Sequence, residues 1–212
     1  MHTLNVTTLL DEVWRLRVVA ALAARRIDGD VALKSYPASR RDSAERLRDM
    51  LVLAARGDAD AAYMQIRYPR RVLPAVGDRD LTPAGWLESH PDDLDQDDDS
   101  FVAAEPWERE SLLDEIHALS TVLAYEVERT EADLALNRFP KSRRWRAEGA
   151  AADLRRAATG ALPFSDFMMP WAEERSEQEA LAAVGARPLL TRSDWRQQYE
   201  AKEAAWQRNT TA

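Results

Sequence analysis

The densest group of residues that could do chemistry is a run of aspartates. Six of them fall in one short stretch, Asp92, Asp93, Asp95, Asp97, Asp98 and Asp99. Ca²⁺ and Mg²⁺ prefer oxygen ligands of this kind. The EF-hand pattern fails, however, because counting from Asp93 or Asp95 leaves its sixth position without glycine and its twelfth without glutamate. We therefore expect an extended, solvated acidic loop without a metal, or alternatively a contact with a basic surface.

Two basic groups with interleaved aromatic residues could bind phosphates and stack on bases. The first comprises Lys141, Arg143, Arg144, Arg146, Arg155 and Arg156, with Trp145 among them. The second comprises Tyr63, Arg67, Tyr68, Arg70 and Arg71. Neither matches a known nucleic-acid module, and a pI near 5.0 opposes non-specific binding to nucleic acid. We favour the interpretation that the basic groups neutralise the acidic ones, within one subunit or between subunits.

Catalytic patterns are weak in this sequence. His117 follows Glu110 and Asp114 at helical spacing, but a di-iron bundle needs a second Glu-x-x-His motif, and the chain has three histidines in all. A Ser-His-Asp triad would require His90 or His117 to meet a serine, and the sequence has no glycine-rich nucleotide loop and no H-E-x-x-H motif. A Mg²⁺-dependent helical hydrolase could use Glu126, Glu128, Glu131 and Asp133, which we expect instead on the wet face of a helix. We predict no catalytic residue, no cofactor and no metal.

Aromatic residues near the carboxyl end are candidates for contacts with a partner. Residues 161–171 are apolar and contain two prolines, so Phe164, Phe167 and Trp171 either cover the core or present an adhesive surface. Further on, Trp195, Tyr199 and Trp206 recur along one side of a predicted helix. Because tryptophan and tyrosine dominate interface hot spots, this stripe could enter a partner's groove or dock on the body of the protein.

Charge is divided between neighbouring blocks of the chain. Residues 80–135 hold 17 acidic and 2 basic side chains, whereas residues 136–160 hold 7 basic and 2 acidic. The chain has no cysteine, seven tryptophans and 45% hydrophobic residues, which favours an ordered globular protein without disulfides. No stretch reaches the apolar length needed to cross a membrane, and no signal peptide is evident, so a protein of the cytoplasm, or one within an assembled particle, is expected.

Apolar periodicity predicts an all-α protein of six to eight helices with little or no sheet. The central helix is expected over residues 106–136, with Pro106 in its first turn and a stripe of Leu112, Ile116, Leu119, Leu123, Val127, Thr130 and Leu134. A first helix is expected over residues 8–27, followed by an extended segment over 31–36. Others are expected over 39–56, 58–68, 82–88, 141–158, 176–184 and 193–208, with an irregular segment between Pro69 and Pro74.

The same pattern suggests a division into four regions. These are an N-terminal helical region (1–79), an acidic linker (80–104), the long helix with the basic helix (105–160) and a C-terminal helical segment (161–212), which could still form one domain. The predicted function is a non-enzymatic assembly role, as a helical adaptor or connector subunit of a larger complex such as a phage particle. A nucleic-acid-binding module is the first alternative, and the helical hydrolase is the second.

Overall fold

The structure, a computed structural model, describes residues 4–33, 38–77, 79–91, 105–161, 177–187 and 190–210. These residues form nine helices and no strand, which confirms the all-α prediction with one helix more than the expected maximum. In chain order the helices are α1 (Val6–Ala32), α2 (Ala38–Ala55), α3 (Ala59–Tyr63), α4 (Pro69–Val76), α5 (Pro83–Ser89), α6 (Pro106–Ala135), α7 (Lys141–Ala158), α8 (Glu177–Ala183) and α9 (Arg192–Thr210).

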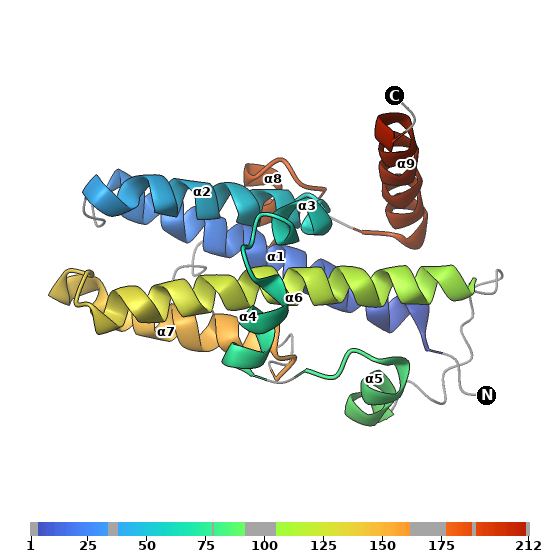
Figure 1. Ribbon diagram of the computed structural model, residues 1–212, viewed down its shortest axis with the longest axis horizontal. Helices are drawn as coiled ribbons and strands as arrows, with labels where there is room; N and C mark the ends of the chain where they lie inside the picture. Colours follow the sequence, from blue (N-terminus) through green and yellow to red (C-terminus); the bar gives the residue numbers. More distant parts are fainter. Residues whose placement is uncertain are drawn as a thin grey trace.

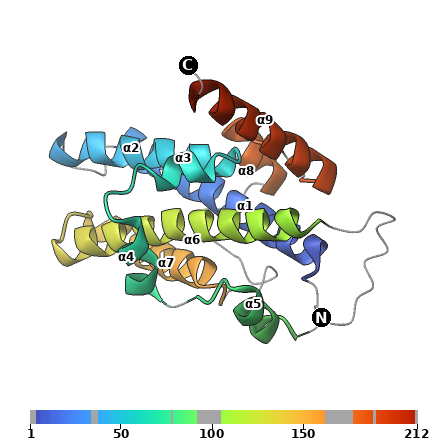
Figure 2. The same ribbon diagram turned by 45° about the vertical axis from the view of Figure 1, so that its right-hand side comes forward.

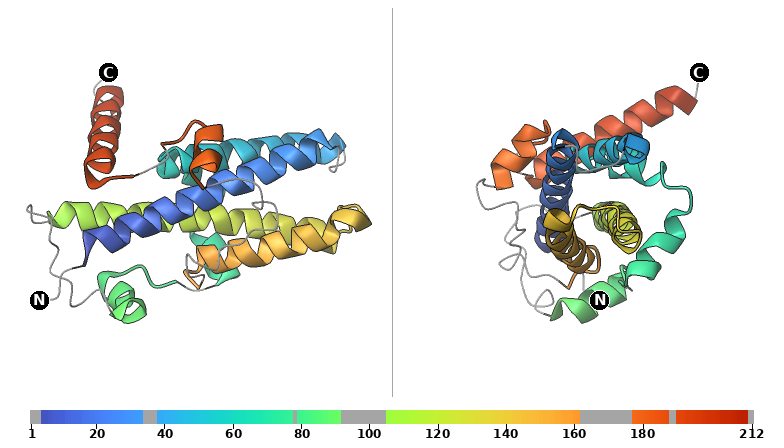
Figure 3. Two further views of the ribbon diagram at one scale, coloured as in Figure 1. Left: turned by 180° about the vertical axis from the view of Figure 1, so that it is seen from behind. Right: turned by 90° about the vertical axis from the view of Figure 1, so that its left-hand side faces the viewer.

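Helix α6 is the centre of the bundle, as its length predicted. It packs against α1, α2, α3, α4 and α7, and Figure 1 and Figure 3 show these helices on several sides of it. Every residue of the predicted apolar stripe is buried, from Leu112 to Leu134. Pro106 begins the helix, and Glu105 and Glu108 form a capping box there. The helix ends where Asn137 adopts a positive φ of 51°.

Helix α1 is longer at both ends than the sequence predicted. It begins after Asn5, whose side chain accepts a 2.8 Å hydrogen bond from the Thr7 amide. It then continues through Gly29 to Ala32, so the predicted extended segment from Val31 is wrong in its first two residues; residues 34–36 lie outside the described residues. The last turns persist because Asp30 is buried and paired with Arg26 and Arg143. Tertiary contacts therefore outweigh the helix-ending tendency of glycine.

Helix α4 replaces the irregular segment predicted between Pro69 and Pro74. Pro69 occupies the first turn, where its missing N–H is harmless, and Pro74 lies inside the helix. Val72, Leu73 and Val76 are buried, and α4 packs across α6. Burial of this apolar face offsets the hydrogen bond that Pro74 cannot make. The helix predicted over residues 58–68 is correspondingly shorter and ends at Tyr63.

A buried ionic cluster joins α1, α2, α6 and the turn after α6, at the end of the bundle where α6 meets α7. Glu126 and Asp133 of α6 are 0% and 1% exposed, and Arg26 of α1 and Arg129 of α6 are buried beside them. Glu126 pairs with both of these arginines, and Asp133 pairs with Arg129, Arg40 and Arg138. The predicted wet face of α6 is therefore wrong at these two carboxylates. Because α6 is surrounded by helices, charges on that side are buried and must be paired.

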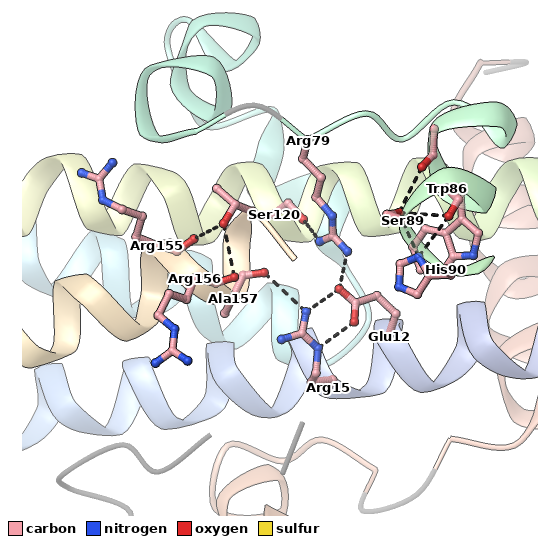
Figure 4. Close-up of polar contacts among 12 residues, drawn as sticks. Glu12, Arg15, Arg79, Trp86, Ser89, His90, Ser120, Arg155, Arg156 and Ala157 are labelled. Carbon is pink, nitrogen blue, oxygen red and sulfur yellow. Dashed lines mark hydrogen bonds and ion pairs between the residues drawn. The ribbon is translucent and has the colours of Figure 1, made fainter. Parts of the chain in front are cut away.

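Two arginines of α1 are also buried. Arg15 and Arg26 are 5% and 9% exposed. Arg15 donates to Glu12 at 2.6 Å and 2.5 Å, and Arg79 donates to the same carboxylate at 2.5 Å (Figure 4). Burial works to raise the pKa of Glu12, but its hydrogen bonds and Coulomb attraction to these two arginines lower it overall. These contacts tie the segment before α5 to α1.

Two predicted features lie outside the described residues. They are the aspartate run of residues 92–99 and the aromatic residues Phe164, Phe167 and Trp171. Within the part of the chain that the structure describes, no helix combines the length and apolar character needed to cross a bilayer.

Candidate protein-binding site

Helix α9 stands away from the bundle. Figure 1 and Figure 2 show it rising from the end where α6 begins, with its carboxyl end pointing away from the other helices. Its first turns contain the buried Trp195, whereas Glu200, Glu203, Ala204, Trp206 and Gln207 in its later turns are exposed. Because most of the stability of a helix in a protein comes from tertiary packing, the attachment at its base has to hold α9 in place.

The base of α9 is attached by a buried carboxylate at the start of α6. Glu108 is 0% exposed and accepts hydrogen bonds from Arg192 at 3.0 Å and 2.8 Å and from Arg196 at 2.6 Å. Burial works to raise the pKa of Glu108, but the hydrogen bonds from Arg192 and Arg196 outweigh it and lower the pKa to about 2. The carboxylate therefore remains charged and paired at neutral pH.

An aromatic stack forms the second attachment. Trp195 lies 5.9 Å from Trp107 of α6 and 5.5 Å from Tyr199, measured between ring centroids. The indole Nε1 of Trp195 donates a 2.9 Å hydrogen bond to Glu115 of α6. Arg17 of α1 donates to the same Glu115 at 3.0 Å and 2.5 Å, and also to Gln198 of α9 at 3.0 Å. Three helices thus meet around one buried carboxylate.

Above this attachment, a shallow groove of about 260 Å³ lies along α9 beside Trp107 in the first turn of α6. It is lined by Trp107, Tyr199, Glu200, Glu203, Ala204 and Gln207. Trp107 and Tyr199, 5.1 Å apart between ring centroids, supply its aromatic wall, and the two glutamates give it an acidic rim. Arg196 lies over the ring of Trp107 but is paired with Glu108. The groove therefore suits an apolar side chain that has a basic neighbour.

The predicted stripe of Trp195, Tyr199 and Trp206 divides into three roles. Trp195 is 1% exposed and docks on the body, Tyr199 is half-buried and lines the groove, and Trp206 is 64% exposed. Sequence reasoning missed Trp107, which completes the groove from α6. The feature that could have indicated Trp107 is its type and place, a large aromatic residue directly after Pro106 in the first turn of a predicted helix.

The basic group predicted on α7 is largely dispersed around the helix. Arg143 faces α1 and pairs with Asp30 at 2.9 Å, and Arg155 pairs with Glu131 of α6 at 2.6 Å. Arg144 pairs with Glu148 and Arg156 with Asp153, both within α7. Lys141 and Arg146 have no acidic partner among the described residues, and Arg146 lies 5.2 Å from the Trp145 ring. Most of the group is thus neutralised within the chain.

The second basic group is assembled and exposed. Arg67 and Arg71 lie 5.3 Å and 5.7 Å from the ring centroid of Tyr68, whose side chain is 57% exposed. Arg70 is exposed next to them. Within the described ranges, no carboxylate forms an ion pair with any of these three arginines, in contrast to most of those on α7. We call Arg67, Tyr68, Arg70 and Arg71 the α3–α4 basic patch.

A second, polar cleft of about 280 Å³ lies between α5 and the end of α7. Its lining residues are Arg79, Asp80, Gly85, Glu88, Ser89, His90, Thr159 and Gly160. Ser89 Oγ lies 3.0 Å from His90 Nδ1, so a histidine does meet a serine (Figure 4). Ser89 also donates to the carbonyls of Gly85 and Trp86, and the His90 ring stacks on Trp86 at 4.0 Å. These contacts lie at the carboxyl end of α5. Among the described residues, no carboxylate forms a hydrogen bond with the His90 ring to complete a triad.

Among the described residues, no second set of metal ligands lies near His117. The centroid of its ring lies 5.9 Å from that of Tyr63. Burial lowers the pKa of His117, although the nearby charge of Asp114 acts to raise it. Among the residues that the structure describes, no group of three or more histidine, aspartate or glutamate side chains is placed to hold a metal ion. Comparison with protein-family models, with curated proteins and with solved structures finds no match for this chain.

Proposed function

We propose that this protein is an assembly subunit, a helical adaptor or connector that binds a protein partner through the groove at the base of α9. The observation that carries the proposal is the projecting half of α9, which is exposed above a firmly attached base and borders an aromatic groove. Such an arrangement resembles an interface hot spot, where an aromatic pocket receives an anchor residue. The proposed partner presents an apolar side chain beside a basic one.

Filling the groove is expected to dissociate the assembly. Ala204→Gln places a long polar side chain in the groove, whereas Ala201→Gln, the matched control, adds the same side chain at another exposed position of α9. Size-exclusion chromatography of native lysate, with antibody detection, should find the wild type and Ala201→Gln well above the 24.0 kDa monomer. Ala204→Gln should shift to the monomer position. A wild-type protein that is monomeric both in lysate and when purified would rule out the assembly role.

The α3–α4 basic patch supports a second candidate, binding of single-stranded nucleic acid. Arginines without acidic partners can neutralise phosphates, and an exposed tyrosine offers a stacking surface. The net charge of −8 opposes this function over the molecule as a whole. The patch would therefore have to act locally.

Replacing Arg67, Arg70 and Arg71 together by alanine tests that candidate. Binding to a single-stranded oligonucleotide should weaken, and the magnitude of the slope of log K against log salt should fall by about 0.7 for each phosphate that an arginine no longer neutralises. Lys141→Ala/Arg146→Ala on α7 is the control, with an unchanged slope expected. No measurable binding of the wild type at low salt would exclude the candidate.

A further inference from the structure

The end of the molecule where α6 is followed by α7 exposes apolar and basic side chains. Leu136 is 59% exposed and Trp145 is 58% exposed. Lys141 lies one helical turn before Trp145, and the Arg146 guanidinium lies 5.2 Å from its ring. Neither cation has an acidic partner within the described part of the chain, so this surface keeps its positive charge. We call Leu136, Lys141, Trp145 and Arg146 the basic tip.

The α9 groove combines aromatic side chains with acidic ones. Its aromatic wall of Trp107 and Tyr199 is rimmed by Glu200 and Glu203, and Glu105 and Glu110 are exposed at the start of α6. Among the described residues, the charges of each surface that have no ion-pair partner share one sign, and the two signs are complementary. The groove volume of about 260 Å³ can receive an indole side chain.

The two surfaces lie at opposite ends of the molecule. Helix α6 runs along the long axis, and the groove lies at its first turn, whereas the basic tip lies beyond its last turn. Figure 1 and the left view of Figure 3 agree in placing α9 and the start of α7 at these two ends. The surfaces cannot meet within one chain, although they can meet between two.

From this geometry we propose that the partner bound in the α9 groove is a second copy of this chain, which inserts Trp145 of its basic tip. The inference rests on the proposed function and names its partner. Because the two contacting surfaces differ, the contact is head-to-tail and leaves one free groove and one free tip on every dimer. Copies therefore add in a row, or close into a ring if the rotation between neighbours allows it.

The mass of the purified full-length protein tests the inference directly. Sedimentation or light scattering over a concentration series should give a mass that passes beyond the dimer at low salt. The mass should fall toward that of the monomer at about 0.5 M salt, where charges are screened over a few ångströms. Trp145→Ala should weaken self-association by roughly 30-fold or more, the effect of losing a hot-spot anchor. Met64→Ala, which removes a 77% exposed apolar side chain on neither surface, should leave it unchanged.

Charge reversal distinguishes this contact from other modes of association. Lys141→Glu/Arg146→Glu reverses the tip, and Glu200→Lys/Glu203→Lys reverses the groove, so each variant alone should remain monomeric. An equimolar mixture should assemble again, because each tip then meets a groove of opposite charge. Arg67→Glu/Arg71→Glu controls for the change in net charge and should assemble like the wild type.

Failure of this inference can be told apart from failure of the proposed function. A purified wild type that is monomeric at every concentration and salt overturns the second-copy contact, as does a charge-reversed mixture that stays monomeric. If the species in native lysate is nevertheless large and is dissociated by Ala204→Gln, the groove binds a different protein. In that case the assembly role stands and the partner named here is wrong.

Discussion

Replacing Glu126 by alanine is expected to lower the free energy of unfolding by about 3 to 5 kcal/mol. The Glu126 side chain is 0% exposed, pairs with Arg26 and Arg129, and accepts a 3.1 Å hydrogen bond from Thr130. Its removal takes the Glu126 charge away from two buried guanidinium groups, whose contacts to the carboxylates of Asp30, at 3.4 Å, and Asp133, at 3.5 Å, are long. Urea unfolding followed by circular dichroism would measure the loss.

Two variants show whether the buried charge causes the effect. Glu131→Ala removes a carboxylate that is 46% exposed and pairs with Arg155 at 2.6 Å, so it should cost less than about 1 kcal/mol. The double variant Arg26→Met/Glu126→Leu should recover much of the stability, because an apolar pair of similar volume avoids the cost of burying charge. A Glu126→Ala protein no less stable than Glu131→Ala would mean that the cluster adds little to the fold.

Replacing Trp195 by alanine is expected to release α9 while the bundle stays folded. The indole is 1% exposed, and its truncation removes the stack on Trp107 and the hydrogen bond to Glu115. A buried tryptophan replaced by alanine typically costs about 3 to 5 kcal/mol. Because α9 is attached mainly at its base, that loss should appear as local opening instead of global unfolding. Hydrogen exchange should show residues 192–210 exchanging near the unfolded rate, with bundle amides still protected.

Trp206→Ala provides the matched control for the attachment of α9. This tryptophan is 64% exposed on the same helix, so its removal should change stability by no more than about 0.5 kcal/mol and leave the exchange of α9 unchanged. Release of α9 in Trp195→Ala should also abolish self-association, since the groove loses one wall. Amides of α9 that remain protected in Trp195→Ala would show that Glu108 and its two arginines suffice to hold the helix.

Local pattern was sufficient to predict most of the helices. The periodic leucines of α6 and the capping residues of α5 and α6 lie within a few positions of one another, so neighbouring residues determine the local backbone. Errors occurred where distant contacts outweighed local preference. The continuation of α1 past Gly29 and the helix at Pro69 both depend on burial against other elements.

Only part of the candidate site could be predicted from the sequence. The aromatic stripe on α9 was predicted, and an assembly role remains a prediction from it. The groove also needs Trp107, which is far from Tyr199 along the chain and comes close only because α9 docks at the start of α6. Likewise the arginines of α7 look alike in sequence, yet Arg143 is neutralised by α1 while Arg146 remains exposed.

The sequence by itself determined the helical class, the apolar stripe of each long helix and the division of charge into opposed blocks. Only the tertiary structure decided which charges are buried pairs and which remain available at the surface. Arg26 and Glu126 are 100 residues apart and form an ion pair, and no local pattern encodes that choice. The physical reason is that periodicity fixes which face of a helix is apolar, whereas the fate of a charged side chain depends on which other helix packs over it.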